Sequence, residues 1–139
     1  METDPERRRR GLETMTEVYG WEMSDGDGDF FAYTVEHLFA DIWNRPGLSV
    51  RDRRLLLLGV LVGHNDHDVL PIQLGAAFAN GELDEQALRE IVVFLSHYAG
   101  WPAGARLFTQ VEKVLADAAR AAARAAEVGH DADAGTDEV

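Results

Sequence analysis

Apolar residues spaced three and four positions apart recur along most of the chain, and this spacing is the strongest constraint on its fold. The pattern predicts six helices, over residues 5–19, 30–43, 49–62, 69–79, 85–99 and 103–126. Glycine, proline and short polar residues separate these segments and end each run of apolar spacing. No segment alternates apolar and polar residues between hairpin turns, as a strand would. The sequence therefore predicts an all-α fold of about six helices.

The chain of 139 residues is long enough for one hydrophobic core, so we predict a single domain over residues 1–128. Residues 129–139 are small, acidic and free of aromatic side chains, which predicts a disordered tail. The longest apolar stretch, residues 55–62, is too short to cross a bilayer. The acidic N-terminus lacks the order of residues found in a secretory signal, so we expect a cytoplasmic protein.

Charge and composition exclude several classes of function. The formal net charge of −12 argues against binding to nucleic acid, which requires clustered cations. The one basic run, residues 7–10, is interpreted as a solvated helix face, with a subunit contact as the alternative. The chain contains no cysteine, so disulfides, thiolate nucleophiles and cysteine zinc sites are excluded. The helix at 49–62 is apolar on nearly every side, which predicts a central position or a place between subunits.

Three short stretches in a fixed order carry a family resemblance: IWNRPGL at 42–48, AAFANG at 76–81 and YAGWPA at 98–103. Together with the helices between them, they resemble the carboxymuconolactone decarboxylase family over about residues 31–115. The resemblance implies an all-helical, alkylhydroperoxidase-like fold. It also implies a homo-oligomer, commonly a trimer or a hexamer.

The family contains a peroxidase branch and a decarboxylase branch. The peroxidase branch has two cysteines and a histidine where this chain has Asp66, Val69 and Gln73, so a thiol peroxidase is excluded. The glutamate of its proton relay aligns with Arg54. The decarboxylase branch keeps a histidine at the position of Gln73 and an arginine at that of Gly75. Glutamine can hydrogen-bond a substrate but cannot transfer a proton, and glycine cannot hold a carboxylate.

The leading hypothesis is a cofactor-independent decarboxylase or lyase that acts on a small carboxylated lactone or a related metabolite. Such an enzyme must hold a carboxylate, stabilise the developing enolate and deliver one proton. The candidate catalytic residues are His97, His37 and Glu36, and the candidate substrate-binding residues are Gln73, Arg45 and Trp101. Each has a structural alternative: the histidines and Trp101 as core or interface residues, Glu36 on the surface, and Arg45 fixing a turn.

Two further interpretations stay open. A non-catalytic oligomer that binds a small molecule or acts as a scaffold would explain the loss of the family histidine at Gln73. The run His64–Asp68 has metal-ligand side chains, but a polar turn between two helices would look the same. The segment Asp25–Asp29 resembles a calcium loop, except that Phe30 occupies its sixth position, where glycine is needed. We therefore expect neither a metal nor a cofactor.

Overall fold

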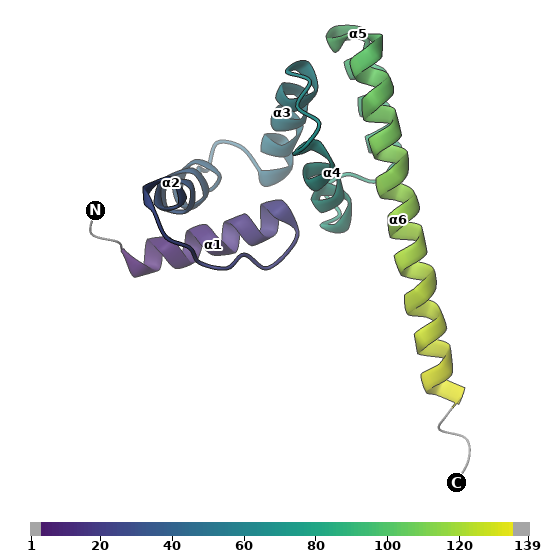
Figure 1. The fold of residues 1–139 in the computed structure, drawn as a ribbon, viewed down its shortest axis with the longest axis horizontal. Coiled ribbons are helices and arrows are strands. Elements are labelled where there is room, and N and C mark those ends of the chain that lie inside the picture. Colours follow the sequence, from purple (N-terminus) through teal and green to yellow (C-terminus); the bar gives the residue numbers. More distant parts are fainter. Residues whose placement is uncertain (1–3, 135–139) are drawn as a thin grey trace.

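The computed structural model describes residues 4–134, and within this range it contains helices and no strand. The all-α prediction is therefore confirmed for these residues. Figure 1 shows the order of the elements. They are α1 (Pro5–Tyr19), α2 (Asp29–Tyr33), the π-helical segment η1 (Thr34–Ile42), α3 (Val50–Gly63), α4 (Leu70–Ala79), α5 (Glu85–Ala99) and α6 (Trp101–Ala134).

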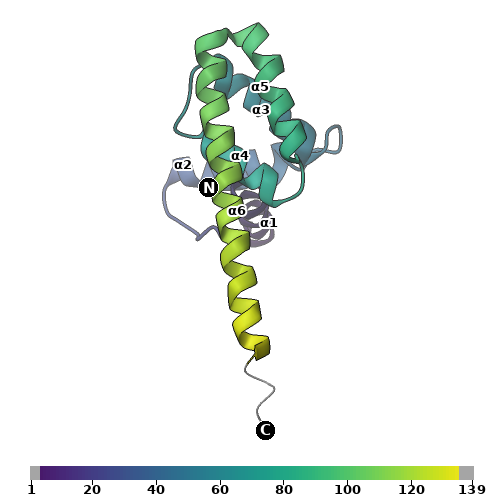
Figure 2. The ribbon, with the colours of Figure 1, turned by 90° about the vertical axis from the view of Figure 1, so that its right-hand side faces the viewer.

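Short polar side chains begin the helices where the sequence places them. Ser49 Oγ accepts a hydrogen bond from the Asp52 backbone N–H at 3.1 Å, and Asp84 Oδ1 accepts one from the Ala87 N–H at 2.8 Å. The turn between α5 and α6 is a single residue, Gly100, with φ of 99°. Glycine adopts this left-handed conformation without a steric penalty, so α6 folds back beside α5 (Figure 2).

The segment predicted as one α-helix over 30–43 is split in the structure. The short α2 passes into nine residues of π-helix, and the Trp43 N–H donates to the Leu38 carbonyl five residues earlier. Apolar spacing predicts that such a segment is helical, but it does not separate an α-helix from a π-helix. The segment η1 packs closely on α1, since a side chain on Gly11 would overlap the Val35 carbonyl oxygen.

Two groups of buried side chains hold the fold together. The larger joins α3, α4, α5 and α6, and the smaller joins α1 to η1. Figure 1 shows α1 and α2 on one side of α3 and α4, and the α5–α6 hairpin on the other. Fully buried members of the larger group include Leu58, Leu70, Leu74, Leu88 and Leu107, and the smaller group contains Met15, Val18, Val35, Phe39 and Trp43.

Helix α6 is 34 residues long and extends well beyond the rest of the molecule (Figures 1 and 2). We predicted that this helix ends near residue 126 and that a disordered tail begins at residue 129. The helix instead continues through Ala134, and residues 135–139 lie outside the described range. Alanine favours helix up to Ala126, whereas helix propensity does not explain the continuation through Gly129, Asp131 and Asp133. No helix between residues 4 and 134 combines the length and apolar character needed to cross a membrane.

Candidate functional site

Gln73, which aligns with the family histidine, lies in a buried polar network with Arg54. The Arg54 side chain is fully buried, and its Nη1 donates to Gln73 Oε1 at 2.6 Å and to the Val18 carbonyl oxygen. Its Nε and Nη2 donate to the two carboxylate oxygens of Glu82, at 3.3 and 2.9 Å. Asn80 Nδ2 donates to Glu82 as well, at 3.3 Å. The network therefore connects α1, α3, α4 and the turn after α4.

This network satisfies the charge of Arg54 inside the protein. A buried cation needs a paired anion and hydrogen-bond acceptors, and Glu82, Gln73 and Val18 supply both. Glu82 is not among the site residues predicted from the sequence. Arg54 directly precedes the apolar run of α3, and a buried arginine needs an anionic partner. Its position was therefore the one feature of the sequence that pointed to a buried acidic residue.

His97 and Trp101 lie together at the turn between α5 and α6. The two rings meet edge to face, with centroids 6.1 Å apart. His97 Nδ1 lies 2.7 Å from the Val93 carbonyl oxygen. Since a carbonyl oxygen only accepts, Nδ1 carries the proton of this hydrogen bond. Nε2 is then the nitrogen that can take up or release a proton.

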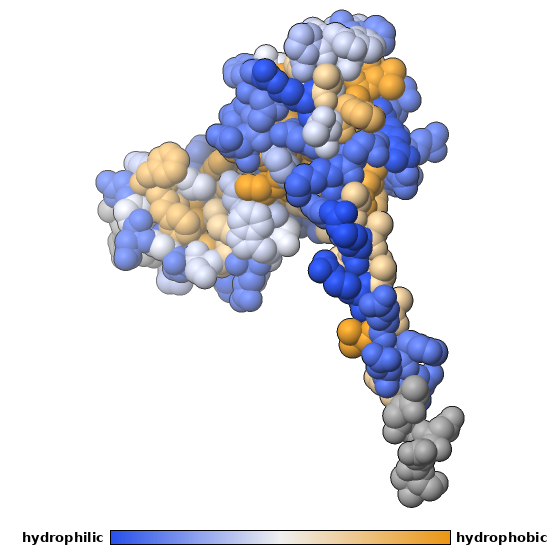
Figure 3. Space-filling view, turned by 45° about the vertical axis from the view of Figure 1, so that its right-hand side comes forward, coloured by the Kyte–Doolittle hydropathy of each residue, from blue (hydrophilic) through white to orange (hydrophobic). Residues whose placement is uncertain are grey.

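Large apolar side chains surround His97 and are not covered by the rest of the chain. The rings of Phe94 and Tyr98 contact each other at 5.1 Å, and Trp101 is 70% exposed. Figure 3 shows apolar surface on this hairpin next to strongly hydrophilic side chains. An exposed apolar surface of this kind marks an interaction or ligand site. We call Val93, Phe94, Tyr98 and Trp101 the hairpin patch; all four are more than half exposed.

Glu36 and His37, the other catalytic candidates, lie in η1 and point apart. Glu36 is buried, and one carboxylate oxygen accepts from Arg8 Nη1 at 2.9 Å. His37 is exposed, with Nδ1 3.8 Å from Asp41 Oδ2. Figure 1 places this part of the chain on the opposite side of α3 and α4 from the α5–α6 hairpin. One chain therefore does not bring Glu36 or His37 beside His97.

The basic run at the start of α1 is divided between solvent and neighbouring elements: Arg9 and Arg10 are exposed, as predicted, whereas Arg7 and Arg8 are partly buried. Arg8 donates to Asp25 at 2.6 Å, and this hydrogen bond holds the pKa of the Asp25 carboxyl below its usual value. Arg7 Nε donates to the Glu36 carbonyl oxygen at 2.8 Å. Arg7 and Arg8 thus hold η1 and the Asp25 loop against α1.

The remaining candidates lie in turns. The Arg45 side chain is exposed, and its carbonyl oxygen accepts from Arg53 Nη2 at 2.8 Å. His67 Nε2 is 2.6 Å from Asn65 Oδ1 and 3.3 Å from Arg106 Nη1, so a cation already lies beside this imidazole. Between residues 4 and 134, no three histidine or acidic side chains are grouped in a way that would hold a metal ion.

An open groove of about 740 Å³ lies between α4 and α6. Gly75, which aligns with the family arginine, lines it, and a Cβ at this position would have no neighbour within 4 Å. The missing side chain therefore opens the groove. Its lining residues are Pro71, Gly75, Phe78 and Ala79 of α4, and Gln110, Lys113, Val114, Asp117, Ala118 and Ala121 of α6.

Comparisons of the sequence with known proteins find one family and two relatives. The model of the carboxymuconolactone decarboxylase family matches residues 28–113. A 4-carboxymuconolactone decarboxylase of Acinetobacter baylyi is 32% identical over 122 residues, which cover 82% of this chain and 90% of that protein. A nitrosuccinic acid decarboxylase of Metarhizium robertsii is 30% identical over 83 residues, covering 60% of this chain and 57% of that protein.

Proposed function

Because this chain belongs to the carboxymuconolactone decarboxylase family, we propose that it is a decarboxylase that acts without a cofactor on a small carboxylated metabolite. The observation that carries the proposal is the similarity to a 4-carboxymuconolactone decarboxylase along most of both chains. A carboxylated lactone of that kind is the first substrate to test.

The two relatives suggest a chemical class of substrate. Their names specify a carboxylated lactone in one case and a nitro acid in the other. In both compounds, loss of carbon dioxide leaves an electron pair that a neighbouring acceptor can delocalise, as an enolate or as a nitronate. The substrate supplies the electron sink, so the protein needs only to bind the carboxylate, stabilise the anion and deliver a proton.

His97 is our first candidate for the proton donor. Its Nδ1–H is held by the Val93 carbonyl oxygen, which orients the ring and leaves Nε2 for the substrate. The bond between the carboxylate carbon and its neighbour breaks, carbon dioxide leaves, and the carbanion takes the proton from Nε2–H. Trp101 then forms one wall of the site, edge-on to the imidazole.

The other candidates have subordinate roles in this proposal. His37 is the second possible proton donor, because its imidazole is exposed. Glu36 and Gln73 act as positioning residues, since each is buried and already paired with an arginine. Arg45 offers an exposed guanidinium that can hold a carboxylate.

We further propose that the protein works as a homo-oligomer, a trimer or a hexamer, in which another subunit covers the hairpin patch. In a single chain the patch is open to water, and an open site gives little electrostatic stabilisation to a developing anion. Covering Tyr98 and Trp101 would exclude water from the side of His97 that faces the substrate.

The test is to mix purified protein of known mass with γ-carboxymuconolactone and follow both loss of substrate and release of carbon dioxide. We expect turnover that falls at least a hundredfold in His97→Ala, with the oligomer unchanged. If His37→Ala abolishes turnover and His97→Ala does not, the proton donor lies in η1. No turnover by a correctly assembled protein would reject this substrate.

One observation favours a second function, a non-catalytic oligomer that binds a small molecule or acts as a scaffold. The position of the family histidine holds Gln73, whose carbonyl oxygen is engaged by Arg54 inside the protein. In that case small carboxylated ligands would raise the melting temperature without being consumed. Measuring ligand binding and carbon dioxide release on the same sample separates the two functions.

A further inference from the structure

We propose that the projecting half of α6 pairs with the same segment of a second copy of this chain, in antiparallel orientation. The family match ends at residue 113, whereas α6 continues to Ala134. The extension therefore lies outside the matched part of the family model, and the pairing does not depend on the proposed function.

A row of apolar residues runs along one face of α6 at alternating intervals of three and four, the spacing of a coiled-coil seam. Near the start of the helix this seam is part of the core, because Leu107 and Val111 are fully buried. Beyond Val114 the same seam continues without a covering element. Its members are Gly104, Leu107, Val111, Val114, Ala118, Ala121, Ala125, Val128 and Ala132.

The exposed residues of the seam are small, which allows a second helix to pack close to α6. From Ala118 onward the seam is alanine and one valine, and the positions beside it on one edge are Ala122 and Gly129. Two helices with such faces can approach closely, because no long side chain separates them. Figure 3 shows weakly apolar residues along the projecting half of α6, among strongly hydrophilic ones.

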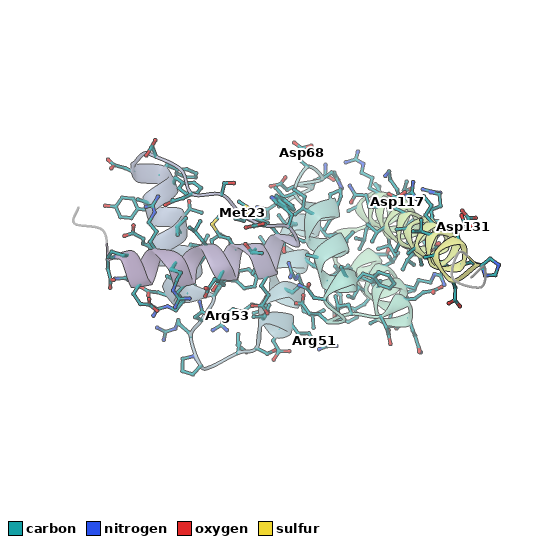
Figure 4. The ribbon with its side chains drawn as sticks, turned by 90° about the horizontal axis from the view of Figure 1, so that it is seen from below. Met23, Arg51, Arg53, Asp68, Asp117 and Asp131 are labelled. Carbon is teal, nitrogen blue, oxygen red and sulfur yellow. The ribbon has the colours of Figure 1, made fainter. Side chains whose placement is uncertain are left out.

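The other edge of the seam carries Asp117, Arg124 and Asp131, one in each heptad. In Figure 4 the labelled Asp117 and Asp131 lie on the same side of α6. Antiparallel helices bring these edges together, so Asp117 of each copy can meet Arg124 of the other, twice in a symmetric pair. In a parallel pair this edge would face Ala122, which has no charge. Charge complementarity therefore selects the antiparallel arrangement.

Arg124 has no ion pair within residues 4–134, so it is available for this contact. Asp117 is already ionised, because hydrogen bonds from Lys113 and Arg120 lower its pKa. A partner's Arg124 would add a third cation to a carboxylate that still has free lone pairs.

The same register fills the groove between α4 and α6. With Asp117 opposite Arg124, Val128 of the second copy lies level with Lys113 and Val114, which line the groove. Val128 is 70% exposed in the single chain. Its side chain would enter the space left by Gly75, next to Phe78. By symmetry both grooves of the pair are filled, which makes the surface self-complementary.

The first experiment compares two substitutions that place the same glutamate on different faces of α6. Ala121→Glu puts a charge in the seam, and Ala123→Glu puts one on the opposite face; glutamate favours helix at both positions. We expect the particle mass in sedimentation equilibrium to fall twofold for Ala121→Glu and to stay unchanged for Ala123→Glu. Circular dichroism checks that both variants remain helical.

A charge exchange tests the orientation. Arg124→Asp and Asp117→Arg should each weaken the pairing at least tenfold, and the double variant should restore it, because it recreates the opposite charges. The double variant does not regain the contacts of Asp117 with Lys113 and Arg120 inside the chain, so any restoration comes from the contact between copies. A wild-type monomer, an unchanged mass for Ala121→Glu, or no restoration in the double variant would overturn the proposal.

Discussion

Replacing Glu82 by glutamine removes the anion that compensates a fully buried arginine. Glu82→Gln keeps the shape of the side chain but leaves the Arg54 guanidinium with neutral partners only. Breaking a buried ion pair by removing one partner costs about 3–5 kcal/mol. The Glu82 side chain is 12% exposed, so water reaches its edge, and we expect a loss near the lower limit, about 3 kcal/mol. For a chain of this size that corresponds to a melting temperature lower by roughly 10 °C.

Urea unfolding followed by circular dichroism at pH 7 measures this loss directly. The matched control is Glu112→Gln, which breaks a bidentate pair with Arg89 at 2.9 and 3.1 Å on the exposed surface. Exposed pairs contribute little, so the control should unfold close to the wild type. In Arg54→Met/Glu82→Gln, where no buried charge remains, much of the stability should return. Equal midpoints for Glu82→Gln and Glu112→Gln would refute the argument.

Three other outcomes follow from the packing and charges of the fold. Gly11→Ala should destabilise the protein by more than about 2 kcal/mol, because the new methyl group overlaps the Val35 carbonyl and forces α1 away from η1. In the single chain a methyl group at Gly75 meets nothing within 4 Å, so Gly75→Ala should raise the free energy of unfolding in urea by about 0.5–1 kcal/mol at protein concentrations where the chain is unpaired. The hydrogen bond from Arg8 lowers the pKa of Asp25 in the folded protein. The pair therefore stabilises the folded state above the pKa of Asp25 in the unfolded chain, which is about 4. This stabilisation is lost as the pH falls through the lower pKa of the folded state. Between pH 6 and pH 3, Asp25→Asn should therefore lose less of its free energy of unfolding than the wild type. An equal loss in both proteins would show that the Asp25–Arg8 pair does not contribute to the pH dependence.

The helices could be predicted from the sequence because each one buries a stripe of its surface. Residues 5–19 match α1, and the segments predicted at 69–79 and 85–99 differ from α4 and α5 by at most one residue. Caps such as Ser49 and Asp84 set the starting points through local hydrogen bonds. The π-helical segment η1 could not be predicted in this way, since its widened turn depends on packing against α1.

The environment of the candidate site was harder to predict, because periodicity does not tell what covers an apolar residue. Phe94 and Tyr98 follow the spacing of core positions, yet both are more than half exposed in the single chain. The pairing of Arg54 with Glu82 spans 28 residues, and nothing in the local pattern connects them. In α6 the three-and-four spacing continues through the alanine stretch in smaller residues, and the spacing alone does not show that this face is uncovered.

The identities of residues 54 and 73 depend on each other, and this dependence can be measured. Gln73→His would restore the family's residue but place an imidazole beside the buried Arg54 guanidinium, which is 2.6 Å from the Gln73 oxygen. Burial and a neighbouring cation both lower the pKa of an imidazole. The unfolded chain would then bind a proton, near its ordinary pKa of about 6.5, that the folded chain does not bind. Stability relative to wild type should therefore fall as pH drops from 7.5 to 5.5, by about 1 kcal/mol.

The same substitution should not create decarboxylase activity by itself, because the new imidazole would stay neutral and enclosed. Arg54→Gln/Gln73→His removes the cation and should abolish most of the added pH dependence. If Gln73→His alone raises turnover of γ-carboxymuconolactone, substrate reaches position 73 in spite of its burial, and the buried network rather than the hairpin patch is where the chemistry takes place.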